Sequence, residues 1–223
     1  MTPPPMRLRR RRTHILARSY LTYRALWPLL EAEAAAVLAA RGGGAQPLVL
    51  DLGCGGRPYA DLFATAHYIG MDYSVQGALP DVVGSAEQLP FRDACADIAF
   101  STQVIEHVAH PQRLLQEAFR VLKPGGLLLL SGPFYWPLHE EPHDYYRYTP
   151  HGLRHLLSAA GFDVLRLRPD AGAVTQAAVA VIEVLPRALY FLVPLINLAT
   201  PLLQRLSRND KSTLNYVLVA QRP

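Results

Sequence analysis

The sequence predicts an α/β fold built around an open, mostly parallel β-sheet. Short apolar runs alternate with helical patterns from residue 48 to residue 130, and this rhythm is typical of parallel strands joined by crossover helices. The first run, Leu48–Leu50, ends in an acid and then in three glycines within four residues. Such a sequence indicates a buried strand that stops at a ligand-binding turn. At 223 residues the chain is long enough for one medium-sized domain with an elaboration.

Charge is unevenly distributed along the chain. The net charge is +4, yet residues 1–30 hold seven arginines and no acid, so the remainder is net negative and does not read as a basic nucleic-acid binder. We expect residues 1–13 to be a basic, disordered head. A solvated tail, a segment for an anionic membrane surface or RNA phosphate, and a transit peptide are its open interpretations. Cys54 and Cys95 do not suggest a disulfide framework, so we expect a cytoplasmic location.

Residues 14–44 are expected to form N-terminal helices that precede the sheet. Apolar residues recur there at helical spacing, and the second half is rich in alanine. Pro28 should start or kink a second helix, because proline lacks the backbone N–H of a helix interior. The glycines at 42–44 should end the helical region.

The turn after the first strand could hold several kinds of ligand, or it could be a plain strand–helix connection. A dinucleotide-binding turn would need a glycine where Pro58 stands, and a phosphate-binding P-loop would need a Gly-Lys-Ser/Thr sequence that is absent. The pattern D-x-G-x-G, formed by Asp51, Gly53 and Gly55, resembles motif I of the class I S-adenosylmethionine-dependent methyltransferases.

The second strand also ends in an acid. We expect a crossover helix at Tyr59–Ala66 and a strand at His67–Met71, followed by Asp72. Asp72 lies 21 residues after Asp51, close to the spacing at which a βαβ unit places a carboxylate on ribose hydroxyls. A carboxylate suits a vicinal diol because each of its oxygens can accept one O–H.

The remaining elements continue the alternation. Apolar runs predict buried strands, and a helix with proline at its first position and one apolar face separates two of them. The predicted strands are Val82–Gly84, Ala96–Ser101, Leu127–Leu130, Phe162–Leu167 and Asn215–Ala220, and the predicted helices are Pro111–Leu122 and Pro150–Ala160.

Three further segments strengthen the resemblance. GSAEQLPF, ADIAFSTQVIEHV and FRVLKPGGLLLLSGPF look like the successive motifs of the class I methyltransferases, in the family's order and spacing. The resemblance implies a Rossmann-like methyltransferase fold, with a seven-stranded, mostly parallel sheet and an antiparallel last strand. It assigns residues 45–172 to the core and residues 209–223 to the last strand, and it implies S-adenosyl-L-methionine as cofactor.

The resemblance also implies roles for the residues at the strand ends. The backbone of Gly53 and Gly55 would face the methionine end of the cofactor, which Asp51 would hold by hydrogen bonds. Asp72 would take the ribose hydroxyls, and Gln103 would close over the site from the end of the fourth strand.

The adenine end of the implied site departs from the common pattern. Ala86 and Glu87 would lie at the adenine edge, with Leu89 beside the ring. Ser85 stands where an aspartate often reads the adenine amino group, and it can still hydrogen-bond that group more weakly. Arg57 replaces the family's common third glycine.

The segment Gly132–Thr149 is dense in His, Tyr and acidic residues, and it follows the fifth strand. His139-Glu-Glu-Pro-His143 matches the H-E-x-x-H zinc pattern literally, but that motif needs both histidines on one helix and Pro142 would break it. We therefore expect a functional loop without a metal ion.

A hydroxyl acceptor of the methyl group would need a general base, and histidine suits that task near neutral pH. Tyr146 and Arg147 could orient the acceptor. The candidate catalytic residues are His107, His139, His143 and Asp144, and for each histidine a purely structural hydrogen-bonding role stays open.

Residues 173–208 form a strongly apolar insertion before the last strand. Its longest uncharged run, Ala188–Gln204, is 17 residues and contains Pro194 and Pro201, so we do not expect it to span a membrane. A helical pair is expected instead. It could cap the substrate pocket, form a homodimer face or lie in a membrane interface.

These observations predict a small-molecule methyltransferase. A glycan, lipid-linked or secondary-metabolite hydroxyl is the expected acceptor, and the basic head with the apolar insertion favours a peripheral position at the inner membrane face. An RNA methyltransferase is the alternative that the basic head favours, although no RNA-binding module is recognisable. A non-catalytic relative that binds partners through the insertion is the other.

Overall fold

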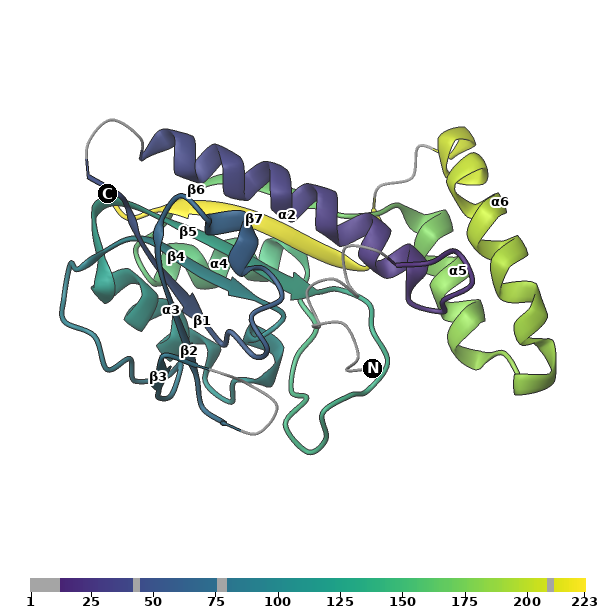
Figure 1. Cartoon of the computed structure of the whole chain (residues 1–223), viewed down its shortest axis with the longest axis horizontal. Helices are drawn as coiled ribbons and strands as arrows, with labels where there is room; N and C mark the ends of the chain where they lie inside the picture. The colour runs from purple at the N-terminus through teal and green to yellow at the C-terminus, as the bar shows by residue number, and fades with distance from the viewer. Residues whose placement is uncertain (1–12, 42–44, 76–79, 208–210) are drawn as a thin grey trace.

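The computed structural model describes residues 13–41, 45–75, 80–207 and 211–223. Residues 1–12 of the expected basic head and the glycines at 42–44 lie outside the described residues. One seven-stranded sheet forms the centre of the molecule, in the order β3-β2-β1-β4-β5-β7-β6 (Figure 1). The strands are β1 Leu48–Leu52, β2 His67–Asp72, β3 Val82–Val83, β4 Ala96–Thr102, β5 Leu122–Pro133, β6 Asp163–Pro169 and β7 Asn215–Gln221.

The sheet has the predicted topology. β1 pairs in parallel with both β2 and β4, whereas β7 runs antiparallel between β5 and β6. The chain proceeds from β1 outward to β3 and then returns to β4 on the other side of β1. The carboxyl ends of β1 and β4 therefore form the topological switch point, where open α/β sheets bind their ligands.

The N-terminal region, for which one or two helices were expected, forms one helix. Helix α2, Tyr20–Ala40, contains Pro28 in its interior, so the prediction that Pro28 starts a second helix is wrong. Pro28 faces solvent, where water can satisfy the carbonyl left without a donor. Leu26 and Leu30 on either side are buried against the sheet, and this packing holds both halves of the helix together.

Helices cover both faces of the sheet. α2 and the short 3-10 turn η1, Ala60–Phe63, pack on one face with a core of aromatic and aliphatic side chains. Helices α3, Pro111–Val121, and α4, Pro150–Ala159, cover the other. We expected a helix over Tyr59–Ala66, but only the short 3-10 turn η1 forms there. β5 begins five residues earlier than predicted, because the segment after α3 already pairs with β4 at Leu122.

The apolar insertion is the expected helical pair. It contains α5, Ala173–Val184, the 3-10 turn η3, Arg187–Leu192, and α6, Val193–Leu206, and it projects from one end of the molecule beyond the start of α2 (Figure 1). Of the described residues, only the 20-residue stretch Arg187–Leu206 is long and apolar enough to cross a membrane, by length and composition alone.

Helix α6 has polar residues on its buried side and apolar residues on its exposed side. Asn197 and Thr200 are among its buried residues, and Asn197 Nδ2 donates to the carbonyl oxygens of Ile15 and Ala17 at 2.6 and 3.0 Å. The exposed side carries large apolar residues that are 52–84 % exposed, here called the α6 stripe: Leu195, Leu198, Leu202, Leu203 and Leu206.

Candidate active site

A cavity of about 930 Å³ opens at the carboxyl ends of β1, β2 and β4, at the switch point of the sheet. Nearly all of the predicted cofactor-binding residues line it; Leu89 is buried in the core beside it. Those in the lining are Asp51, Gly53, Gly55, Asp72, Ser85, Ala86, Glu87 and Gln103.

The glycine turn has the backbone geometry that its composition predicts. Gly53 adopts φ +88° and Gly55 adopts φ +48°, both in the region that favours glycine. A Cβ on Gly53 would lie 2.4 Å from Val104 Cγ2, whereas one on Gly55 would meet nothing within 4 Å. Arg57 also has a positive φ, 54°, and its guanidinium pairs with Asp81 at 2.7 Å.

Asp51 presents an unsatisfied carboxylate oxygen at the end of β1. The Tyr68 hydroxyl donates to Oδ2, while Oδ1 is buried and has no hydrogen-bond partner among the described residues. Burial raises the pKa of Asp51 from 3.8 to about 7. A buried acceptor of this kind fits a cationic or N–H donor of a ligand in the cavity, such as the ammonium of a methionine moiety.

Asp72 is held in place by the backbone. Its Oδ2 accepts from Gly55 N at 2.8 Å, and its Oδ1 accepts from Ser74 N at 3.0 Å. Each carboxylate oxygen can accept two hydrogen bonds, so both retain capacity for a hydroxyl. The residues present therefore fit a nucleoside with a vicinal diol.

The remaining cofactor candidates are held by local hydrogen bonds. Ser85 Oγ accepts from Glu87 N at 3.1 Å, and Glu87 Oε1 accepts from His110 N at 3.2 Å. Gln103 follows β4 with φ 55°, and its amide donates to Ser131 Oγ at 3.0 Å. These hydrogen bonds fix the side chains of Ser85, Glu87 and Gln103 at the cavity wall, where the ring of a bound ligand could stack on them or form hydrogen bonds with them.

Comparison with known proteins agrees with this geometry. A methyltransferase domain family matches residues 50–130, which run from β1 into β5 and include the glycine turn, Asp72 and Gln103. The chain is 40 % identical over 96 residues to a probable S-adenosylmethionine-dependent methyltransferase of Mycolicibacterium smegmatis, covering 38 % of this chain and 37 % of that protein.

Residues 50–130 therefore resemble a methyltransferase domain.

Other relatives extend the same likeness. An uncharacterised methyltransferase of Mycolicibacterium gilvum is 40 % identical over 106 residues, or 39 % of this chain and 41 % of that protein. The chain thus spans about two fifths of the length of these curated relatives. The solved S-adenosylmethionine-dependent methyltransferase of Mesorhizobium loti has a TM-score of 0.58 at 19 % identity, over 91 % of this chain and all of that one. The cyclase SpnF has a TM-score of 0.56 at 21 % identity, over 86 % and 80 %, so the fold alone does not fix the reaction.

The loop that follows β5 forms another part of the cavity wall. Residues 137–148 between β5 and α4 contain no helix, so His139 and His143 do not share the helix face that the H-E-x-x-H motif requires. His107, His139 and His143 all line the cavity, and the His107 and His139 rings meet edge to face with centroids 4.7 Å apart.

Three predicted residues brace this loop and lie outside the cavity lining. Asp144 accepts from both terminal nitrogens of Arg147 at 2.6 and 2.7 Å and from His139 N at 3.0 Å. These bonds hold the pKa of Asp144 far below its usual range. Arg147 Nε donates to Trp136 O at 3.0 Å, and the Tyr146 hydroxyl donates to Ala109 O at 3.0 Å.

Sequence reasoning missed Glu106. It lies in the short turn η2, Ile105–His107, and is completely buried. Neither carboxylate oxygen has a hydrogen-bond partner among the described residues, and burial raises its pKa from 4.5 to about 8. Its position directly before His107 in the third motif was the available signal. Helix α2 also contributes Thr22 and Tyr23 to the cavity wall. No local sequence pattern predicts this contribution, because only the tertiary packing of α2 brings these residues to the cavity.

Proposed function

We propose that the chain is an S-adenosyl-L-methionine-dependent methyltransferase that acts on a small or amphipathic acceptor, such as a hydroxyl of a glycan, lipid-linked or secondary-metabolite molecule. The unpartnered Asp51 oxygen in a cavity that also contains the backbone-held Asp72 carries this proposal. The two acids suit the amino-acid and sugar ends of the cofactor respectively.

The chain's own residues would bind and orient the cofactor. Asp51 would accept from its ammonium, Asp72 would accept from its ribose hydroxyls, and the open backbone at Gly53 and Gly55 would allow close approach. When bound, S-adenosylmethionine supplies an activated methyl group, so the protein must mainly position the acceptor and exclude water. Ser85 and Glu87 would lie at the base edge.

A general base for a hydroxyl acceptor would come from the histidines of the cavity wall. His107 Nδ1 bonds to the His143 carbonyl oxygen at 2.8 Å, so Nδ1 carries the proton in the neutral ring and Nε2 is free to accept one. Asp144 is a poorer base, because its pair with Arg147 keeps it ionised and weakly basic.

The α6 stripe favours an amphipathic acceptor or a membrane-surface location. The five large apolar side chains of the stripe face outward, while Asn197 and Thr200 face inward. A surface helix of a water-soluble protein usually has the opposite arrangement, with its apolar side chains buried and its polar ones exposed. Asn197 Nδ2 and Thr200 Oγ1 donate hydrogen bonds within the protein, whereas Asn197 Oδ1 has no partner among the described residues. We assign the stripe to the interface of the inner membrane in a cytoplasmic, peripheral enzyme; a homodimer through the insertion is the competing arrangement.

Calorimetric titration with S-adenosylmethionine tests the central proposal. Micromolar binding with one site per chain is the expected result, and absence of heat across buffers would leave the non-catalytic alternative. Cell extracts incubated with the protein and a radiolabelled methyl donor would then be separated into lipid, small-molecule, protein and RNA fractions. We expect label in the lipid or small-molecule fraction, whereas label in RNA would favour the alternative enzyme class.

A further inference from the structure

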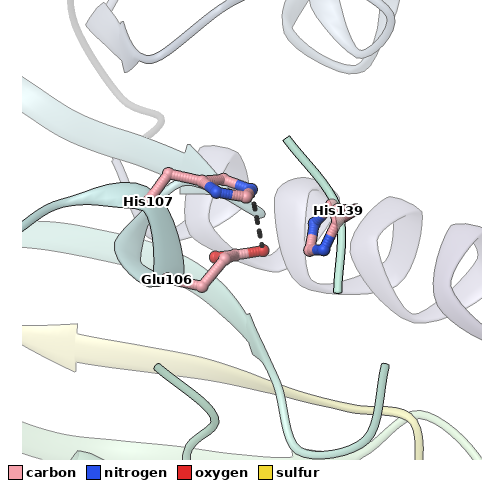
Figure 2. Close-up of side chains that lie close together, drawn as sticks. All are labelled: Glu106, His107 and His139. Atoms are coloured by element: carbon pink, nitrogen blue, oxygen red, sulfur yellow. Dashed lines mark ion pairs between the residues drawn. The ribbon is translucent and has the colours of Figure 1, made fainter. Parts of the chain in front are cut away.

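Three potential metal ligands meet at the wall of the cavity. Glu106 and His107 come from η2, and His139 comes from the loop after β5 (Figure 2). One ligand atom from each lies within 4.8 Å of the others, and His107 Nε2 is 3.9 Å from Glu106 Oε1. Atoms bound to one zinc ion stand roughly 3.4 Å apart, so a small rotation of His139 would close the remaining distance.

The outer nitrogens of both histidines are already engaged. His107 Nδ1 lies 2.8 Å from the His143 carbonyl oxygen, and His139 Nδ1 lies 3.2 Å from the Pro137 carbonyl oxygen. In each neutral ring Nδ1 therefore donates its proton, which leaves the Nε2 lone pair free. Metal-binding histidines typically have this arrangement, in which the second nitrogen donates to a carbonyl or carboxylate and fixes the tautomer.

Glu106 supplies an independent indication of a cation. Its side chain is fully buried, and both carboxylate oxygens lack a hydrogen-bond partner among the described residues. A buried carboxyl group without hydrogen-bond partners stays protonated unless a cation compensates its charge. Arg147, the nearby cation of the loop, is already committed to Asp144 through two hydrogen bonds.

We propose that Glu106, His107 and His139 form a binding site for a divalent first-row transition-metal ion such as zinc. Two imidazoles with one carboxylate suit such ions. This site differs from the literal H-E-x-x-H reading, because it uses only His139 from that motif and takes its other ligands from η2. The sequence predicts no metal site, so this proposal departs from that prediction.

The position of the site suggests its chemistry. His107 and His139 line the same cavity as Asp51 and Asp72, while Glu106 lies behind them. Three protein ligands leave coordination positions open toward the cavity. If the chain is the methyltransferase proposed above, on which this step rests, an oxygen atom of the acceptor would occupy an open position and be held there for transfer. His107 Nε2 would then be a metal ligand rather than a base, so the acceptor proton would pass to His143, which also lines the cavity.

Metal binding can be measured without any activity. Chelator-treated protein is dialysed to equilibrium against zinc, and bound zinc is determined by elemental analysis. We expect one zinc ion per chain, and we expect Glu106→Gln and His139→Ala to weaken its binding by more than about tenfold. His155→Ala is the matched control, because His155 is an exposed histidine of α4 outside the cavity. His143→Ala should also retain zinc, which separates this site from the loop motif.

Thermal unfolding provides a second readout that does not depend on dialysis. Zinc should raise the melting temperature of the unmodified protein and of His155→Ala but not that of Glu106→Gln. Glu106→Gln alone should remain folded, because the amide is uncharged and has nearly the same volume as the carboxyl group. Zinc binding that is absent, or equal in all the variants, would overturn the proposal.

The outcome remains separate from that of the proposed function. S-adenosylmethionine titrations on the same metal-free protein report on Asp51 and Asp72, which lie outside the metal site. Cofactor binding without zinc binding would reject only the metal site. Zinc binding without cofactor binding would reject the methyltransferase proposal and its acceptor step.

Discussion

The backbone N–H of Gly55 donates to Oδ2 of Asp72 at 2.8 Å. The glycine turn after β1 and the acid at the end of β2 therefore support one another directly, although they are separate motifs in the sequence. Gly53 N and Cys54 N add hydrogen bonds to the Met71 carbonyl oxygen at 2.8 and 2.9 Å. The two proposed anchoring points for the cofactor are thus preorganised relative to each other, which reduces the entropy that binding must overcome.

Substitution Asp72→Asn should weaken S-adenosylmethionine binding about 10- to 100-fold. It replaces one accepting oxygen by a donor and removes the charge that strengthens the bonds to ribose hydroxyls, a loss of about 1.5–3 kcal/mol. Calorimetric dissociation constants check the change, with Asp163→Asn, on exposed β6 residue Asp163, as control. Equal affinities for all three proteins would contradict the ribose role.

Substitution Gly53→Ala should destabilise the protein by about 3 kcal/mol, because it combines an unfavourable positive φ with a clash against Val104. Gly55→Ala meets no neighbour, so it should cost only about 1 kcal/mol. Denaturant unfolding measures both values. Val104→Ala in the Gly53→Ala background should recover part of the loss; a double variant no more stable than Gly53→Ala would refute the clash.

The Asp51 carboxyl should make stability depend on pH. Burial raises its folded pKa from 3.8 to about 7, so between about pH 4 and pH 7 the folded protein holds a proton that the unfolded chain has released. The free energy of unfolding should therefore fall as pH rises across that window through this group. Urea unfolding at several pH values should show that the free energy of unfolding falls less steeply with pH in Asp51→Asn than in the unmodified protein. The same pH dependence in both proteins would argue against the raised pKa.

The same carboxyl should couple cofactor binding to proton release. An ammonium beside Asp51 favours the ionised form, so binding near pH 6.5 should expel a proton and affinity should rise toward pH 8. Titrations at pH 6.5 in buffers of different ionisation enthalpy would reveal the proton as a buffer-dependent heat. Asp51→Asn should show heats that do not depend on the buffer, and a buffer dependence that persists in this variant would contradict the assignment to Asp51.

The Asp144–Arg147 pair should stabilise the acceptor loop rather than supply a base. Asp144→Asn should cost about 1–3 kcal/mol near pH 7, because it weakens charge-assisted hydrogen bonds to Arg147. Since pairing lowers the pKa of Asp144, its contribution is present above about pH 4 and is lost as pH falls further. The difference in unfolding free energy between the two proteins should therefore be smaller at pH 3 than at pH 7.

The α6 stripe should mediate binding to lipid vesicles. Leu198→Gln combined with Leu202→Gln removes two side chains that are 61 % and 58 % exposed, and we expect it to reduce flotation with anionic vesicles several-fold. S-adenosylmethionine affinity should not change, which shows that the fold is intact. Equal flotation of both proteins would exclude the stripe as the contact; a concentration-dependent dimer lost in the variant would favour the homodimer.

The sequence predicts the strands well because each is a short apolar run, and the runs of β1, β2, β3 and β5 are closed by a glycine or an acid. These local signals agree with the sheet. Pro28 illustrates a limit: tertiary packing of Leu26 and Leu30 overrides the local preference to break the helix. The candidate site divides in the same way. Asp51 and Asp72 lie at strand ends, so their spacing in the sequence predicts their positions. The proximity of Glu106 and His139 could not be predicted, because it depends on the course of a loop that has no regular sequence pattern.

Asn197 also joins the insertion to the chain that leads into α2. Its side-chain amide donates to the carbonyl oxygens of Ile15 and Ala17. Ser19 and Thr22, a few residues later in the chain, lie in the cavity wall. A tilt of α6 would therefore pull, through the two hydrogen bonds of Asn197, on the segment that leads to the rim of the cavity. If α6 lies on a membrane as proposed, Asn197 provides a direct connection between that contact and the chain beside the cavity.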